Sequence, residues 1–126
     1  MTLADEIIQG RVPQFQAYVQ AGDSLDDIDE YGFTPLIETI LMHRPDLTLA
    51  LIKLGVNIDK PDMAGRSALQ WAVDNEDKPL VELLLQHQAN PNNYTLQGFS
   101  ALVYPILRQD EPIKQLLLKH LSLIHI

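Results

Sequence analysis

Gly32-Phe33-Thr34-Pro35-Leu36 is followed 33 residues later by Gly65-Arg66-Ser67-Ala68-Leu69, and after another 33 residues by Gly98-Phe99-Ser100-Ala101-Leu102. The same spacing aligns three further sets of apolar residues: Ile40, Val73 and Ile106; Leu51, Leu84 and Leu117; and Ile52, Leu85 and Leu118. A fixed period of this length indicates a repeat architecture, in which each unit buries its apolar face against its neighbours.

Each repeat has the same order of local signals. Its glycine permits a positive φ in a turn, and the hydroxyl residue that follows (Thr34, Ser67 or Ser100) is suited to cap a helix N-terminus. A short helix and a loop come next. A second, leucine-rich helix then carries Pro79 or Pro112 in its first turn, where a missing N–H is tolerated. The repeat is therefore predicted to be turn, helix, loop, helix.

The segments 31–36 and 49–57 resemble the ankyrin repeat, and the second and third units keep its Ser-Ala-Leu motif. This resemblance implies an all-α ankyrin-repeat solenoid of stacked helix-turn-helix units with β-turn fingers. The expected boundaries are 1–28 for an N-terminal capping helix pair, with helices near 2–9 and 12–20, then 29–61, 62–94 and 95–120 for three repeats. The third repeat can be incomplete at its end.

Two features depart from the family pattern. Ile37, Gln70 and Val103 stand where the family usually has histidine, so the hydrogen bonds of that histidine must be absent or replaced. Pro105 falls inside the first helix of the third repeat, where its ring would clash with the carbonyl four residues before it, at a cost of about 3 kcal/mol. We expect that helix to be kinked or shortened.

The last six residues, 121–126, do not follow the repeat. Leu121 and Leu123 stand in the columns of Gly55 and Asn57, so that apolar side chains replace turn residues. The sequence Leu-Ser-Leu-Ile-His-Ile also resembles the conceptual translation of a transposon-end adapter used in DNA library preparation. We expect a non-native tail here, and a natural protein that continues beyond His120.

The composition excludes several classes of function. The 126 residues include 17 acidic and 9 basic residues, giving a net charge of −8, which argues against nucleic acid as a partner. The absence of cysteine removes disulfides, thiolate zinc sites and a cysteine nucleophile. The acidic N-terminus does not resemble a secretory signal, and no run approaches the ~20 apolar residues that span a bilayer. We expect a cytoplasmic monomer without membrane contact, or a protein secreted into a host cell if the chain belongs to an effector.

The sequence contains no convincing catalytic, cofactor or metal motif. The run Asp27-x-Asp29-x-Tyr31-Gly32 with Glu38 partly imitates an EF-hand loop, but Tyr31 replaces an oxygen ligand. His87 and His120 share a column at the end of the second helix, where a cation favours the helix dipole. The serines lie outside any nucleophile elbow. We therefore expect no enzyme activity, no cofactor and no bound metal.

An acidic stretch precedes the first full repeat. Asp23, Asp26, Asp27, Asp29 and Glu30 place five carboxylates within eight residues. The stretch is either a hydrated loop between the cap and the repeat, or a patch that steers a basic partner toward the protein.

The resemblance implies that the turn tips and the inner side of the first helices contact another protein in the concave groove. The expected partner-binding residues are Glu30, Tyr31, Phe33, Leu41, Met42, Met63, Arg66, Trp71, Asp74, Asn75, Leu96, Gln97, Phe99 and Arg108. Trp71 is either a groove anchor or a filler between repeats. The expected function is non-catalytic protein binding. Two alternatives stay open: a targeting or substrate-recruiting arm of a longer enzyme or secreted effector, and an inhibitory or scaffold protein for a basic partner.

Overall fold

The computed structural model describes residues 3–8, 15–22, 24–92, 95, 98, 100–101 and 103–124. The described residues form eight α-helices, which belong to two compact units, residues 1–63 and residues 64–126. The two units are described separately below.

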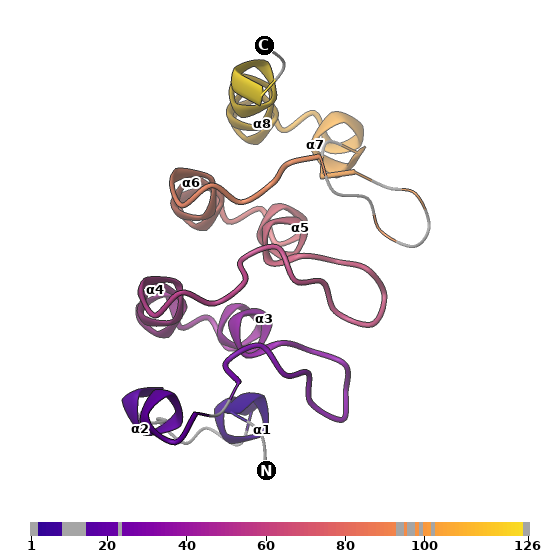
Figure 1. The fold of residues 1–126 in the computed structure, drawn as a ribbon. Helices are drawn as coiled ribbons and strands as arrows, with labels where there is room; N and C mark the ends of the chain where they lie inside the picture. The colour runs from indigo at the N-terminus through magenta and orange to yellow at the C-terminus, as the bar shows by residue number, and fades with distance from the viewer. Residues whose placement is uncertain are drawn as a thin grey trace. The chain divides into compact units, whose positions relative to one another are not determined.

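The N-terminal unit contains the helices α1 (Leu3–Ile8), α2 (Phe15–Gln20), α3 (Pro35–Leu41) and α4 (Pro45–Lys53). Helix α3 packs against both α1 and α4 (Figure 1). Leu3, Ile7, Ile37 and Leu51 are almost completely buried, and each such side chain contributes about 1.5–3 kcal/mol of burial energy. Helices α1 and α2 lie where the sequence predicted the capping pair.

The C-terminal unit contains α5 (Ala68–Asp74), α6 (Lys78–Gln86), α7 (Val103–Arg108) and α8 (Glu111–Ile124). Helix α5 packs against α6 and α7, and α8 packs against α6 and α7 (Figure 1). The buried side chains include Leu69, Leu84, Leu85 and Leu117, which stand in the repeat columns that the sequence indicated as apolar. Most of the described column residues of this unit are therefore part of its core.

Two of the three predicted N-caps are confirmed. The Thr34 hydroxyl accepts a hydrogen bond from the Ile37 N–H (3.1 Å), and the Ser67 hydroxyl accepts one from the Gln70 N–H (3.3 Å). The third prediction is wrong, because α7 begins at Val103 and Ser100 lies three residues before that start.

The later start of α7 follows from Pro105. Helices α3 and α5 each have seven residues, whereas α7 has six and begins two positions later in the repeat. Pro105 is thereby the third residue of its helix, where an N–H would have no helical acceptor in any case. The prediction of a shortened helix is confirmed. The steric clash is avoided because no helical carbonyl lies four residues before this proline.

Helix α8 is longer than its counterparts. Helices α4 and α6 have nine residues each and are followed by Gly55 at φ +91° and Gln88 at φ +69°, respectively. Leu121 occupies the same column, and α8, with 14 residues, continues past it to Ile124. A bulky residue is disfavoured at positive φ, so this column carries no stop signal in the third repeat. Residues 121–124, which the repeat spacing predicts to be part of a tail, therefore belong to the helix.

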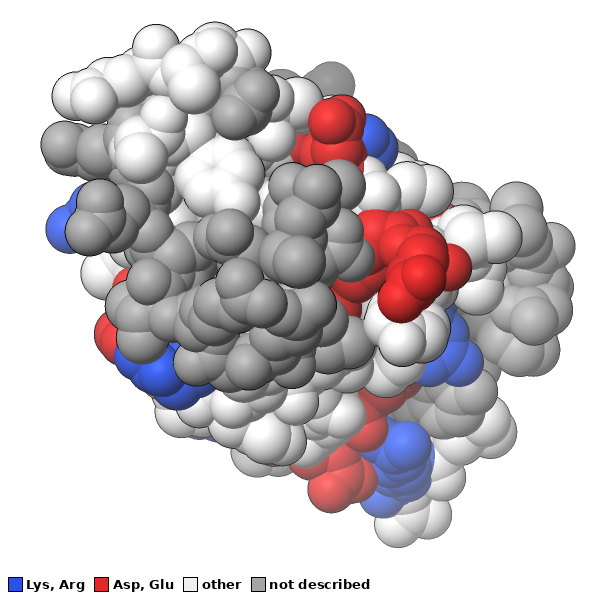
Figure 2. Space-filling model, turned by 90° about the horizontal axis from the view of Figure 1, so that it is seen from below, with Lys and Arg blue, Asp and Glu red and all other residues white. Residues whose placement is uncertain are grey.

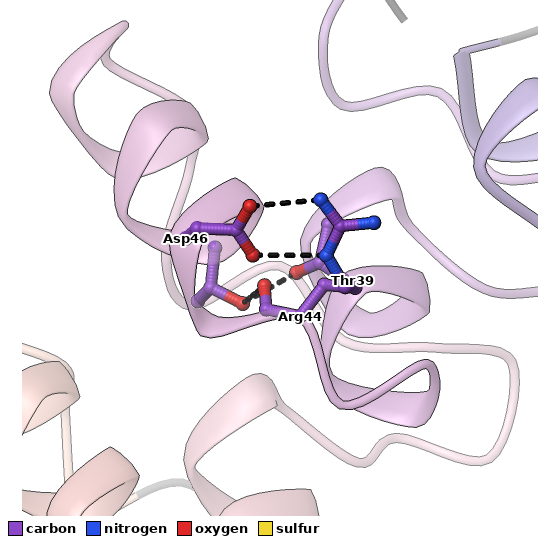
Figure 3. A network of polar contacts seen from close by, with 4 residues as sticks. Thr39, Arg44 and Asp46 are labelled. Carbon is purple, nitrogen blue, oxygen red and sulfur yellow. Dashed lines mark hydrogen bonds and ion pairs between the residues drawn. The ribbon is translucent and has the colours of Figure 1, made fainter. Parts of the chain in front are cut away.

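A buried pair of hydroxyls joins α3 to α4. Thr39 (Figure 3) has its Oγ1 2.7 Å from Thr48 Oγ1. Both side chains are fully buried. Thr39 donates to the Leu36 carbonyl (2.6 Å), while Thr48 also lies within reach of the Arg44 carbonyl (3.1 Å). The pair is thus hydrogen-bonded on both sides, as a buried polar pair needs to be.

The turn before α3, at residues 29–33, is closed by hydrogen bonds to Asp29. The Asp29 N–H donates to the Phe33 carbonyl (2.9 Å), and Asp29 Oδ1 accepts from the N–H groups of Tyr31 (2.9 Å) and Phe33 (3.0 Å). Gly32 adopts φ +84°, and its carbonyl accepts from the Met63 N–H (3.0 Å). A Cβ on Gly32 would lie 2.8 Å from the Met63 Cβ and closer still to the next side-chain atoms. Glycine is required here for both its φ and its small size.

The Thr39–Thr48 pair should show energetic coupling. Replacing Thr48 by Val removes one hydroxyl from a buried pair and should lower the free energy of unfolding by about 1–2 kcal/mol. The double variant Thr39→Ala with Thr48→Val should lose at least about 0.5 kcal/mol less than the sum of the two single losses. The reason is that this double variant recreates the Ala72 and Val81 pair, which is fully buried at the equivalent positions. Urea unfolding of the four proteins measures the cycle, and strictly additive losses would contradict the prediction.

The requirement of Gly32 for a positive φ and its requirement for a small residue can be separated by comparison with a second glycine. Gly55 also has a positive φ, but a Cβ added there meets nothing within 4 Å. Gly55→Ala should therefore lose only the conformational cost, about 1–2 kcal/mol, and Gly32→Ala should lose more because Met63 must move. Thermal and urea unfolding compare the two variants. Equal losses would show that Met63 yields without cost.

Candidate functional site

The turn tip of the N-terminal unit exposes large apolar side chains. Tyr31 is 59% exposed and Met63 68% exposed, and Ile28 beside them is 41% exposed. The Met63 backbone is hydrogen-bonded to Gly32, which brings these residues to one tip. Asp27, two residues before the turn, and Glu30 within it are also exposed. We name this set of five residues (Asp27, Ile28, Glu30, Tyr31 and Met63) the finger surface. Exposed apolar groups with a polar rim are typical of interaction sites.

The acidic stretch divides into two kinds of carboxylate. Asp26 Oδ1 accepts from the Asn57 N–H (2.9 Å), and the Asp26 carbonyl accepts from Lys60 Nζ (2.7 Å). Asp29 is buried and closes the turn. By contrast, the exposed side chains of Asp27 and Glu30 have no hydrogen bond or ion pair within the described part of the chain. Asp23 lies outside the described residues.

The other predicted contact residues of this unit are less exposed. Phe33 is half-buried at the end of the turn, and Leu41 and Met42 are half-buried at the end of α3. Met42 is the C-cap of α3, and its backbone N–H donates to the Glu38 carbonyl. Each of these three side chains is partly packed against the protein and partly exposed to solvent.

In the C-terminal unit, three of the predicted residues form one cluster. The Arg66 guanidinium lies 5.2 Å from the centre of the Trp71 ring. Its Nη1 donates to Asp74 Oδ2 at 2.9 Å. Burial raises the pKa of the Asp74 carboxyl, against the opposing effect of Arg66 and Arg108. Trp71 is half-buried and carries Arg66 over its face, an arrangement worth about 0.5–2 kcal/mol.

Helix α7 adds to this cluster. Arg108 Nη1 donates to the Asp74 carbonyl (2.9 Å) and lies 3.6 Å from Glu76 Oε1. Leu107 is 72% exposed beside it, and Asn75 is exposed at the end of α5. The structure thus brings Arg66, Trp71, Asp74 and Arg108 together. The predicted residues Leu96, Gln97 and Phe99 lie outside the described residues.

Ile106 and Leu118 are exposed although both stand in repeat columns that the sequence indicated as apolar. Ile40 and Val73 are 2% and 1% exposed, but Ile106 in the same column is 57% exposed. The altered start of α7 accompanies this difference. Only the effect of Pro105 on the helix could have indicated it from the sequence.

The residues of the EF-hand-like run and the two histidines predicted at helix ends are described next. Asp29 is engaged by backbone N–H groups, and Glu38 is buried in α3. Within the described residues, no three His, Asp or Glu side chains gather as a metal site would require. His87 is the C-cap of α6. His120 Nδ1 lies 2.9 Å from the Leu116 carbonyl, but α8 continues beyond it, so the predicted helix-end position of His120 is wrong.

The C-terminal unit also has an open pocket of about 580 Å³. It is lined by Leu85, Gln88, Ala89, Asn90, Pro91, Asn92 and His120. None of these lining residues belongs to the predicted partner-binding set. Of the helices that the structure describes, none combines the length and apolar character needed to cross a membrane.

Comparison with known proteins gives three kinds of match. A family model described as ankyrin repeats (3 copies) matches residues 45–125. Inversin is 37% identical in the human protein and 35% in the chicken protein, over 60 residues that are 48% of this chain. A solved structure of the Legionella effector AnkH is 52% identical over 95% of this chain, with a TM-score of 0.86.

These relatives are much longer than the present chain. It spans 26% of the AnkH chain and 6% of human inversin. Ankyrin repeats are generally modules of protein–protein interaction. The predicted all-α ankyrin-repeat fold is confirmed by the helical structure, the family model and the structural match taken together, and the chain belongs to the ankyrin repeat family.

Proposed function

We propose that this chain is a non-catalytic module that binds another protein through its turn tips and the inner side of its first helices. The observation that carries the proposal is the exposure of large apolar side chains at the tips, with Tyr31 at 59% and Met63 at 68%. Leaving such groups in water is unfavourable unless a partner covers them. Membership of the ankyrin family supports the same conclusion.

The cluster in the C-terminal unit supports the proposal independently. Arg66 is held between the Trp71 ring and the Asp74 carboxylate, so its side chain is ordered before any partner arrives. Tryptophan and arginine are enriched among the residues that dominate binding energy. An ordered side chain loses less entropy on association. The exposed Leu107 next to this cluster adds apolar area.

A second candidate function is favoured by one comparison. The chain is 52% identical to part of an effector, and it spans only 26% of that protein. We propose that it is the recruiting arm of a longer effector of similar kind, acting on a protein of the cell into which the effector is secreted. In that case a catalytic activity would belong to another part of the protein, and this arm would supply the contact.

Exposed contact residues should affect affinity without affecting stability. Tyr31→Ala and Leu107→Ala should change the free energy of unfolding by less than about 0.5 kcal/mol, because both side chains are mostly in solvent. Each should weaken binding of a purified partner by about ten-fold or more if it is an anchor. Val19→Ala is the control, since Val19 is 48% exposed on α2 but was not predicted to be a contact residue. Calorimetric titration measures affinity, and a partner that binds all variants equally would place the contact elsewhere.

The effector proposal is tested by the gene. An uninterrupted genomic copy should continue in frame beyond the codon for His120 and encode a further domain. A copy that encodes residues 121–126 and then stops would exclude an extension on the C-terminal side.

A further inference from the structure

The negative charge of the chain belongs almost entirely to the N-terminal unit. Residues 1–63 include 11 acidic and 4 basic residues, a net charge of −7, whereas residues 64–126 include 6 acidic and 5 basic residues, a net charge of −1. In Figure 2 most of the visible acidic side chains lie toward the right of the view, with basic side chains among them. A partner of the N-terminal unit therefore meets a strongly negative field.

On the finger surface this charge is available to a partner. The two exposed carboxylates, Asp27 and Glu30, have no partner within the described residues. Two cations of the same unit, Arg44 and Lys60, are engaged elsewhere. Arg44 donates to both Asp46 oxygens (3.0 and 2.8 Å), and Lys60 donates to the Asp26 carbonyl (2.7 Å).

Apolar groups of the finger surface accompany these two carboxylates. Ile28 precedes and Tyr31 follows the buried Asp29, and Met63 is attached to the turn through Gly32. Lys and Arg side chains combine a charged end with an aliphatic stem that packs on apolar surface. An exposed tyrosine ring also attracts a cation. The finger surface therefore matches both parts of a basic side chain.

We propose that the finger surface binds a basic segment of the partner protein, with Lys or Arg charges at Asp27 and Glu30 and the aliphatic stems on Tyr31 and Met63. This inference rests on the proposed function and names the chemistry of its partner. Exposed ion pairs contribute little affinity each, so the apolar contact supplies most of the binding. The charge selects the partner and accelerates its approach.

Two peptides test the charge requirement. The first is a fluorescein-labelled peptide of twelve residues in which Lys and Arg alternate with Leu and Ser, and the second has Gln in place of every Lys and Arg. Fluorescence anisotropy is measured with the full chain. The basic peptide should bind about ten-fold tighter than the neutral one at low salt, and raising the salt should remove most of that advantage.

Paired substitutions locate the effect. Asp27→Asn with Glu30→Gln should weaken binding of the basic peptide about five- to ten-fold. Glu82→Gln with Glu111→Gln is the control, because both carboxylates are exposed on the C-terminal unit and their loss changes the net charge equally. This control should change the affinity less than about two-fold. Tyr31→Ala should weaken binding at both salt concentrations, since its contribution is apolar.

The inference is overturned if the basic and neutral peptides bind equally or not at all, or if the two paired substitutions have equal effects, which would indicate a response to total charge alone. These failures differ from failure of the proposed function. If a partner protein loses affinity on Leu107→Ala but not with the finger variants, protein binding stands and the basic segment is wrong. If neither unit's variants affect any partner, the proposed function itself fails.

Discussion

None of the eight described helices can bury its apolar face alone, and the structure depends on that constraint. Helices α3 and α5 have seven residues each, which is too short for stability in isolation. They persist because Leu36 and Leu69, which share one repeat column, are enclosed by neighbouring helices, with 3% and 1% of their surface exposed. The 33-residue period supplies this enclosure by placing an apolar residue at the same position of each successive hairpin.

Because the columns supply the core, residues between them can differ from repeat to repeat. Thr39 and Thr48 form a hydrogen-bonded pair where the next repeat has Ala72 and Val81, and all four side chains are fully buried. One joint between helices is thus made by hydroxyls and its equivalent by methyl groups. The same tolerance applies at the turn tips, where side chains contribute less to the core and can serve recognition.

Most of the fold could be predicted from the sequence, because repeat spacing and capping are local signals. The starts of α3 and α5 follow from Thr34 and Ser67, whose hydroxyls cap them. The third repeat is less predictable, since Pro105 moves the helix start and Ile106 becomes exposed although its column is apolar. The extension of helix α8 through Leu121 could not be predicted. The sequence shows only that the usual stop signal is missing at this column, and it does not show that a helix continues there.

The positions of the candidate surfaces could be predicted from the sequence, but the contacts between their side chains could not. Turn tips could be identified from the repeat phase, and Tyr31 and Met63 are exposed there. The hydrogen bond between Arg66 and Asp74 joins residues eight apart through side-chain conformations that no spacing rule fixes. The sequence also could not predict which carboxylates of the acidic stretch bind the backbone and which are exposed to solvent. Asp26 and Asp27 are chemically identical, and only the folded backbone distinguishes them.

That distinction between carboxylates determines how the finger surface can work. Asp29 fixes the turn through two backbone N–H groups, so the direction of Glu30 and Tyr31 is set before binding. A turn held in this way loses little conformational entropy when a partner arrives. It follows that replacing Asp29 would alter the shape of the surface together with its charge. Only Asp27 and Glu30, which hold no part of the backbone in place within the described structure, carry charge that can be removed without also removing the geometry.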